Sequence, residues 1–503
     1  MKASTLFKAA VTALFAVEVA CLDTASKCCN ALAKDRHLRG KVFYPDTSVY
    51  KERLESIWSL SAQQAPWCVV LPGSAEDASI IMKVVSKNKC PFGIRGGGHG
   101  FFALANSVEE GITIDFVHMN TTSYDQEKGV VALGPGCRSA NAFEALEDDG
   151  VAVTAGRIGA VGVAGFILGG GNSYHSGSDG WACDNVINFE VVLADGSIIN
   201  ANEHEHRDLW VALRGSSGNF GLVTRFDMKA IPYADRPLPH IYGGLVTYDL
   251  EKRDEFIDAY LRFVDDTPTD QYSSVGWWQD YYSDTDETVL LAAIENSANK
   301  QGTPQINKLL DVGGIKSNSL RSDSLANIAR ELDGEENLYN IWFTSTFDSD
   351  ARIINYALKR NEELVQEILA AKSPGANLRS RAMFQPITKT MVSHSKGNNV
   401  LGLESRVARG NGVMFLVRVL IDRAEDEAIA IPMVQRLNED ITNYATELGI
   451  NWNWEYLNYA HGLQDPIATF GAENIEKLRK ASRKYDPSGI FQNVRGSGFK
   501  IPF

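Results

Sequence analysis

The sequence contains no dense run of lysine or arginine, and its overall charge is acidic. Its 503 residues carry 49 Lys and Arg against 63 Asp and Glu, which gives a formal net charge of -14. A nucleic-acid-binding protein normally presents a basic patch to the phosphate backbone. The composition therefore disfavours nucleic acid as a partner and favours a small-molecule substrate.

Other signals are missing as well. No two cysteines have the C-x-x-C spacing of a zinc site, so no metal is expected. No apolar run is long enough to span a bilayer, so no membrane anchor is expected. There is no internal repeat and no low-complexity tract. With 44% hydrophobic residues the chain has the composition of a folded globular protein, and it is too long for a single core, so two or three domains are expected.

The N-terminal segment has the pattern of a secretory signal. Lys2 and Lys8 precede a largely apolar stretch, 9–20, which is the charge-then-apolar order of a signal peptide. We therefore predict a signal peptide over residues 1–21 and a secreted protein, with a buried N-terminal helix as the alternative. The sequon Asn120-Thr121-Thr122 is consistent with a secreted glycoprotein.

Six cysteines follow residue 21, and an oxidising compartment would pair some of them as disulfide bonds. Six cysteines allow 15 complete pairings. Cys28 or Cys29 could tie the N-terminal arm to the region of Cys68 and Cys90, while Cys183 lies in an apolar setting and is a candidate free thiol. The sixth is Cys137.

The first half of the chain mixes short strands and helices, which predicts an α+β fold. We expect strands at 68–71, 111–115 and 130–133, and helices at 74–89 and 138–150, the first of these with Ser74 as its N-cap. Residues 190–199 predict a hairpin that turns at Asp195-Gly196.

Prolines around residues 232–239 suggest a domain boundary. Beyond them we expect an antiparallel sheet covered by helices, with strands at 241–246, 274–278, 288–294, 339–346 and 413–419 and helices at 251–264, 350–371 and 425–448. Near the C-terminus, 454–460 predicts a strand with Tyr456 and Asn458 on one face and Tyr459 on the other, and 472–485 predicts a helix.

The most informative segment is Arg95-Gly96-Gly97-Gly98-His99-Gly100. Glycine has no Cβ and accepts positive φ, so such a run lets backbone approach a ligand closely. The imidazole of His99 is presented from this run with few other side chains around it. We expect a ligand to lie against these glycines and to meet His99.

A second glycine cluster recurs at every third residue from Gly156 to Gly165 and continues at Gly169-Gly170-Gly171. That spacing suits a loop whose amides face an anion such as a pyrophosphate. It is not the G-x-G-x-x-G fingerprint of a Rossmann domain. The alternative is a glycine turn with a purely structural role. The presence of two such clusters in one domain argues against that alternative.

Taken in order, these segments resemble those of the berberine-bridge-enzyme-like branch of the vanillyl-alcohol-oxidase-type flavoproteins, and fungal secreted, oxygen-dependent members look most similar. The resemblance runs from about residue 40 to the end. The motifs that carry it are Arg95–His99, Gly159–Gly165, Gly169–Gly171, Asp184-Asn185, Leu193–Gly196, Leu213–Gly221, Asn458-Tyr459 and Tyr485–Gln492.

The resemblance implies a two-domain fold with FAD as cofactor. It places an FAD-binding PCMH-type domain at 40–230, a substrate-binding domain at 231–450 and a C-terminal segment, 451–503, that returns to the FAD domain. It implies a covalent bond from the His99 ring to the flavin 8α-methyl group and a pyrophosphate cradled by the second glycine cluster. The other implied cofactor-binding residues are Arg95, Gly96, Gly97, Gly98, Gly100, Gly156, Gly159, Val161, Gly162, Gly165, Gly169, Cys183, Asn185, Val223, Asn458 and Gln492, with Asp184 and Thr224 near them.

The chain departs from the family at Ile158. Many members of this branch carry a second covalent link from a cysteine at that position, and isoleucine cannot form it. We therefore predict that His99 is the only attachment point. Because doubly linked relatives include oligosaccharide oxidases, the departure is a mild argument against a sugar substrate.

In relatives, a tyrosine at the position of Tyr459 acts as the catalytic base. A free tyrosine has a pKa of about 10, so that role requires stabilisation of the tyrosinate, and a plain core tyrosine is the alternative. The candidates for the substrate wall are aromatic residues that could equally be core residues, namely Trp277, Trp278, Tyr281, Tyr282, Trp342 and Phe415.

We therefore expect an FAD-dependent oxidase that removes a hydride from an alcohol, amine or related carbon of a small substrate. We expect the substrate to be a secondary metabolite, with O2 as electron acceptor and H2O2 as product. The alternatives are a carbohydrate oxidase, an oxidative cyclase and a flavin-binding protein without turnover.

Overall fold

The structure is a computed structural model that describes residues 27–233 and 240–503. The predicted signal peptide and the prolines Pro237 and Pro239 lie outside these ranges. Among the helices within them, none has both the length and the hydropathy to cross a membrane.

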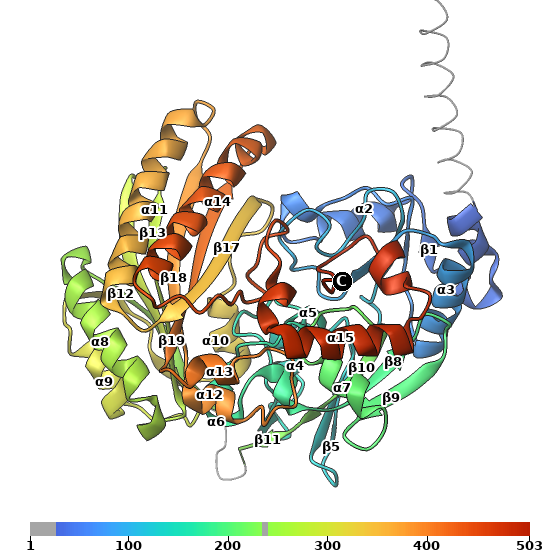
Figure 1. The fold of residues 1–503 in the computed structure, drawn as a ribbon, viewed down its shortest axis with the longest axis horizontal. Coiled ribbons are helices and arrows are strands. Elements are labelled where there is room, and N and C mark those ends of the chain that lie inside the picture. The colour runs from blue at the N-terminus through green and yellow to red at the C-terminus, as the bar shows by residue number, and fades with distance from the viewer. Residues whose placement is uncertain (1–26, 234–239) are drawn as a thin grey trace, which may run out of the picture.

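The first half of the chain builds small sheets around the glycine-rich segments (Figure 1). Its strands are β1 (Val42–Phe43), β2 (Cys68–Val70), β3 (Phe92–Arg95), β4 (Ile112–Asp115), β5 (Thr122–Asp125), β6 (Val130–Leu133), β7 (Val151–Ala152), β8 (Val186–Val192), β9 (Ile198–Asn202), β10 (Leu222–Lys229) and β11 (Ile231–Pro232). One sheet has the order β1-β2-β4-β3, with β2, β4 and β3 parallel. A second is antiparallel in the order β5-β6-β10-β8-β9, and β7 pairs with β11.

Short helices connect these strands. They are α2 (Ser48–Glu55), α3 (Ala75–Asn88), α4 (Ser139–Glu144), α5 (Val163–Leu168), α6 (Ser176–Asp179) and α7 (Arg207–Leu213). The α3 helix begins where the Ser74 hydroxyl accepts a hydrogen bond from the amide of Asp77, as its sequence predicts.

The second half is one antiparallel sheet. Its strands are β12 (Ile241–Tyr248), β13 (Ser273–Tyr282), β14 (Glu287–Asn296), β15 (Ile315–Asn318), β16 (Arg321–Asp323), β17 (Tyr339–Asp348), β18 (Leu378–Ile387) and β19 (Gly412–Ile421). The order is β15-β12-β14-β13-β18-β19-β17, and β16 also pairs with β12. The remaining helices are α8 (Arg253–Asp265), α9 (Pro304–Leu310), α10 (Leu325–Glu331), α11 (Ala351–Ala371), α12 (Lys389–Ser393), α13 (Glu404–Val407), α14 (Ala424–Glu447) and α15 (Ala472–Tyr485).

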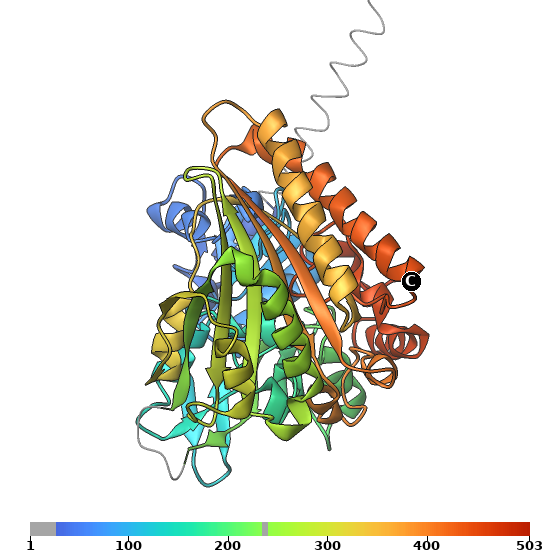
Figure 2. The same ribbon diagram turned by 90° about the vertical axis from the view of Figure 1, so that its left-hand side faces the viewer.

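The two faces of this large sheet pack against different parts of the molecule, because alternate residues of a strand point to opposite sides. One face is covered by α8, α11 and α14, and the long α11 and α14 helices lie side by side over it (Figure 2). Trp277, Phe384 and Val417 belong to the core on that side. The other face meets the glycine-rich half and contributes Trp342 and Leu416 to a shared aromatic cluster. The candidate site therefore lies between the two halves.

After α14 the chain crosses back to the first half (Figure 1). There α15 packs on α7, and Arg495 pairs with Phe92 of β3. The short helical segments that complete the fold are η1 (Arg36–Leu38), η2 (Leu60–Ala62), η3 (Ala182–Asn185), η4 (Leu250–Lys252), η5 (Thr267–Thr269), η6 (Pro466–Phe470) and η7 (Ile490–Val494).

The fold confirms the predicted α+β class and most of the predicted elements, with exceptions. The expected helix 138–150 ends at Glu144, and the acidic run Glu147-Asp148-Asp149 that follows opposes the negative end of a helix dipole. The expected strand 454–460 is wrong, because the Tyr459 amide donates to the Tyr456 carbonyl (2.9 Å) and closes a turn.

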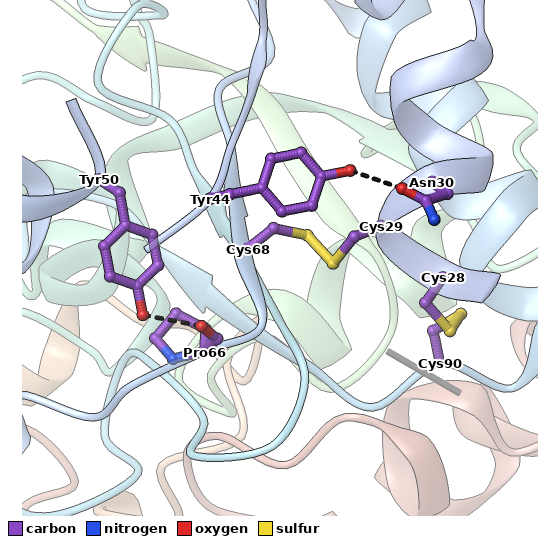
Figure 3. Close-up of a disulfide and its surroundings, with 8 residues drawn as sticks. All are labelled: Cys28, Cys29, Asn30, Tyr44, Tyr50, Pro66, Cys68 and Cys90. Carbon is purple, nitrogen blue, oxygen red and sulfur yellow. Dashed lines mark hydrogen bonds between the residues drawn. A yellow bond between two sulfur atoms is a disulfide. The ribbon is translucent and has the colours of Figure 1, made fainter. Parts of the chain in front are cut away.

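Two disulfide bonds fasten the N-terminal arm (Figure 3). Cys28 bonds to Cys90, and Cys29 bonds to Cys68. This confirms the expected link to that region, and the remaining thiols in the described residues, Cys137 and Cys183, are free and buried.

Loss of the Cys29–Cys68 disulfide is expected to lower the free energy of unfolding by about 2–5 kcal/mol, because the unfolded chain regains the freedom of a long closed loop. Urea unfolding of C29S/C68S, monitored by circular dichroism, measures the change. C137S, which removes a buried free thiol, is the matched control. Equal unfolding midpoints for C29S/C68S and the wild type would show that this bond does not stabilise the fold.

Candidate functional site

Strand β3 delivers the His99 loop to the centre of the molecule. The Arg95 side chain is buried and ion-paired with Asp115 (3.2 Å), and it also donates to the backbone carbonyls of Arg53 and Ser56. Gly98 has φ +76°. A Cβ at Gly98 would lie 2.6 Å from Arg95 Nε, so both the backbone angle and the space require glycine there.

The two glycine clusters touch each other. A Cβ added to Gly97 would lie 2.4 Å from the Gly162 Cα, and one added to Gly162 would lie 2.5 Å from the Gly97 Cα. No side chain fits at either position, so the backbones of the two segments are in direct contact. This places the start of α5 beside the His99 loop.

Most backbone amides of this junction have no acceptor among the described residues. In the ranges that the structure describes, no oxygen accepts a hydrogen bond from the backbone amides of residues 96–100. The amides of Gly162, Ala164 and Gly165 at the start of α5 are also without an acceptor there. Backbone amides in folded proteins are nearly always paired, so this cluster fits a ligand with several acceptor oxygens, as a pyrophosphate has.

In the earlier part of the second glycine cluster, several backbone amides donate to acceptors within the protein. The amide of Gly156 donates to Ser139 Oγ (2.9 Å), that of Gly159 to the Ala329 carbonyl (2.9 Å) and that of Val161 to the Ile158 carbonyl (3.2 Å). The expectation of one loop from 156 to 165 is wrong at its end, because Gly165 lies inside α5. The amides of Gly156, Gly159 and Val161 are therefore engaged with the protein, whereas those of Gly162, Ala164 and Gly165 are not.

The His99 ring is stacked on Trp58, with ring centroids 4.1 Å apart and planes 12° apart. Loss of contact with water, together with the charges of Arg418 and Arg138, lowers the pKa of His99 to about 3. The imidazole is therefore neutral across the physiological range, and a ring nitrogen has its lone pair free.

A row of aromatic rings leads from His99 to Tyr459. Trp58 meets Trp342 edge to face (5.8 Å), and Trp342 meets Tyr459 in the same way (5.8 Å). Phe101 also stacks on Trp342, with ring centroids 4.4 Å apart. The two candidate reactive residues thus lie at the ends of one continuous apolar surface.

The Tyr459 hydroxyl is held by a glutamine of fixed orientation. Gln385 Nε2 lies 3.0 Å from the Tyr459 oxygen. The Gln385 Oε1 accepts from the guanidinium of Arg157 and from Asn172 Nδ2 (3.1 Å). Because two donors occupy its oxygen, the Gln385 amide must present its NH2 group to Tyr459. The phenolic oxygen therefore accepts a hydrogen bond.

The helix α5 also reaches other predicted residues. A Cβ at Gly169 would lie 1.9 Å from Asn458 Oδ1, and Asn458 Nδ2 donates to the Phe166 carbonyl (3.0 Å). The Cys183 amide donates to the Gly170 carbonyl (2.8 Å). Asn458 and Cys183 therefore lie at the C-terminal end of α5, at the opposite end from the His99 loop.

Other predicted residues are engaged with the protein itself. Asn185 Nδ2 donates to the carbonyls of Asp179 (2.8 Å) and Trp181 (3.1 Å), and Asp184 accepts from Asn399 (2.8 Å). These contacts hold the turn at η3. Val223 is buried in β10, Thr224 donates to Glu190 (2.8 Å), and Gln492 donates to Asn219 (3.1 Å).

The candidates for the substrate wall divide between the two faces of the large sheet. Trp342 lies in the cluster at the junction of the two halves, and Trp278 and Tyr282 lie on the same side under Arg381 and Arg379. Trp277 and Phe415 belong to the core under the helices, and Tyr281 packs at its edge, so these assignments are wrong. These residues lie on different faces because alternate residues of a strand point to opposite sides of the sheet.

Four side chains of the site were not predicted from the sequence. Trp58 lies in a segment without a motif, Asn172 directly follows the Gly169–Gly171 motif, Gln385 lies on β18, which the sequence did not predict, and Arg418 lies in an apolar strand. The alternation of Arg379, Arg381 and Gln385 along β18 is the one local signal that marks a strand with a polar face. A group of three or more His, Cys, Asp or Glu side chains placed to hold a metal ion does not occur in residues 27–233 and 240–503.

Residues 66–202 match a family described as an FAD binding domain. The chain is 35% identical over 481 residues to the FAD-dependent monooxygenase sdcF of Emericella nidulans, an alignment that covers 94% of this chain and 98% of that protein.

Solved structures share the fold. Berberine bridge enzyme from Eschscholzia californica is similar with a TM-score of 0.71 at 17% identity, over 95% of this chain and 100% of that chain. Glucooligosaccharide oxidase from Acremonium strictum is similar with a TM-score of 0.72 at 20% identity, over 95% and 100% of the two chains, and its FAD is described as 6-S-cysteinyl and 8α-N1-histidyl.

Proposed function

Because this chain belongs to the berberine-bridge-enzyme-like FAD-linked oxidoreductases of the vanillyl-alcohol-oxidase-type superfamily, we propose that it is an oxidase of a small secondary metabolite. It removes a hydride from an alcohol, amine or related carbon. The observation that carries the proposal is the aromatic row that joins His99, on its glycine loop, to Tyr459, on its glutamine.

The free amides of residues 96–100 and of Gly162, Ala164 and Gly165 would hold the FAD pyrophosphate, and the His99 ring would bond to the flavin. When bound, FAD would supply the hydride-accepting group, with O2 as the final electron acceptor and H2O2 as the product. Ile158 cannot supply a thioether, and the free thiols Cys137 and Cys183 are buried. His99 is therefore the single point of attachment in our proposal.

Tyr459 takes the proton that leaves the substrate O–H or N–H group. Gln385 stabilises the phenolate that accepts this proton, by donating to its oxygen, and the charge of Arg157 polarises the Gln385 amide from the other side. The Arg381 guanidinium also interacts electrostatically with Tyr459. The aromatic surface between His99 and Tyr459 excludes water from the reacting atoms.

Secretion is part of the proposal. The two disulfides support an oxidising compartment. Asn120, the acceptor of the sequon, is exposed just before β5 and is accessible for glycosylation.

A peroxide-coupled screen over benzylic alcohols, amines, sugars and metabolites of the source organism tests the reaction class. Stoichiometric H2O2 without oxygen in the product supports the oxidase. Incorporation of label from 18O2 would instead support a monooxygenase, the activity named for sdcF. Peroxide released with sugars alone would indicate a carbohydrate oxidase, and the absence of flavin reduction by every compound would indicate a binding protein.

Replacement of Gln385 by leucine is expected to slow flavin reduction about tenfold, because one hydrogen bond to a charged oxygen contributes about 1.5–3 kcal/mol, not all of it specific to the transition state. Q305L removes another buried glutamine, far from the site, and is the control. Flavin reduction at the wild-type rate in Q385L would remove Gln385 from the mechanism.

A further inference from the structure

We propose that Arg418 binds an anionic oxygen of the substrate, so that the substrate is a compact planar molecule that carries a carboxylate or an ionised phenol or enol. The inference rests on the proposed function, because it assigns the substrate class of the same site. It starts from a cleft on the large sheet, next to the stack of Trp58 and His99, which we call the arginine cleft. It is lined by Asp280, Tyr282, Arg379, Arg381, Arg418 and Leu420, among others.

Two of the three arginines of the cleft are already paired. Arg381 forms a two-point ion pair with Asp280, at 2.7 Å for each bond. Arg379 pairs with Glu335. These charges are neutralised within the protein and leave little attraction for a ligand.

No carboxylate of the described residues forms an ion pair with Arg418. Its side chain is only 9% exposed, its Nε donates to Asn340 Oδ1 at 3.3 Å, and its Nη2 has no partner in the described part of the chain. The third acid of the cleft, Asp333, is held by the amide of Ala160 (2.8 Å). Buried charges in proteins are normally paired, so this guanidinium is the one left to meet a ligand.

The surroundings of Arg418 select the shape of that ligand. Its guanidinium carbon lies 5.2 Å from the Trp58 ring centroid and 5.5 Å from that of Trp342. The two indoles meet at 78° beside the guanidinium, outside the lining of the cleft, and give that side of Arg418 an apolar surface suited to a flat conjugated ring. The cavity volume of about 210 Å³ is small beside ligand sites of about 300–1,000 Å³, which favours a compact molecule.

The geometry also gives the ligand a direction. Trp342 contacts Arg418 on one side and Tyr459 on the other. An anion paired with Arg418 would lay the rest of the ring along Trp342 toward the phenol of Tyr459. The anionic group would therefore orient the substrate, while lying away from the carbon that is oxidised.

Calorimetric titration of the flavin-loaded protein tests the assignment with three probes. The first two probes are 2-naphthoate and 2-naphthamide, which is an uncharged amide of the same ring system. The third probe is 4-nitrophenolate, which represents an ionised phenol. The wild type should bind 2-naphthoate about 10- to 100-fold more tightly than 2-naphthamide, as expected for a charge-assisted two-point hydrogen bond. R418Q should lose this preference, R418K should keep part of it, and R436Q, which removes an arginine paired with Glu367 outside the cleft, should keep all of it.

Tighter binding of 2-naphthoate than of 4-nitrophenolate would assign a carboxylate substrate, and the reverse would assign an ionised phenol or enol. Equal binding of 2-naphthoate and 2-naphthamide, a preference that survives in R418Q, or no binding of either anion overturns the inference. The flavin content of each variant is measured on the same samples. A protein that carries no flavin contradicts the proposed function, whereas a flavin-loaded protein without the anion preference contradicts only the role of Arg418.

Discussion

H99A is expected to carry no covalently bound flavin, so that all of its yellow fluorescence stays in the supernatant after acid precipitation. The reason is that His99 presents the one ring nitrogen at the junction of the two glycine segments, and that nitrogen is unprotonated because burial and the nearby arginines lower the pKa of His99 to about 3. The chain has no cysteine at position 158 to compensate.

Activity should fall with the link, because the attached flavin is the stronger oxidant. We expect a loss of about tenfold in kcat, equivalent to about 1.4 kcal/mol in activation free energy. H175Q is the matched control, since His175 is a buried histidine of the same half that bonds to Tyr233 (2.8 Å) and lies outside the glycine loop. Covalent flavin in H99A, or its loss in H175Q as well, would contradict a specific role for His99.

Y459F is expected to keep its flavin and to slow its reduction by about 10²- to 10⁴-fold, the usual contribution of a positioned general base. The substitution removes only the hydroxyl that Gln385 holds, and it leaves the ring against Trp342. Rapid mixing with substrate under anaerobic conditions separates this step from reoxidation by O2.

Y248F provides the comparison for Tyr459. Tyr248 is a buried tyrosine under the helices of the large sheet, and its hydroxyl bonds to the Leu309 carbonyl (3.2 Å). Its loss should affect stability slightly and reduction not at all. Wild-type reduction kinetics in Y459F would remove Tyr459 from the mechanism, and the proton acceptor would have to be sought elsewhere in the site.

Local signals in the sequence predicted the elements that local interactions determine. Ser74 marks the start of α3 because its hydroxyl caps the helix, and Asp195-Gly196 marks the hairpin because that pair adopts the required turn. The disulfide region was predicted because an N-terminal arm with adjacent cysteines needs partners, although the pairing itself depends on the tertiary structure.

The site was predicted in part. The contact between Gly97 and Gly162 agrees with the two glycine clusters sharing a ligand, a relation that the sequence pattern suggests. Gln385 and Arg418 could not be inferred, because their importance comes from strands paired across long sequence distances, β18 with β19 and with β13. Trp277 and Trp278 show the same limit, since neighbours on a strand face opposite sides and only the assembled sheet shows which side is the site.

The central claim is that the glycine loop anchors FAD through His99 alone, and peptide mapping of the wild-type protein tests it most directly. Proteolysis followed by mass spectrometry should find the flavin on one peptide, that containing Gly96–Gly100, with the added mass on His99. Flavin recovered only in free form, or bound to a peptide containing Cys137 or Cys183, would contradict it.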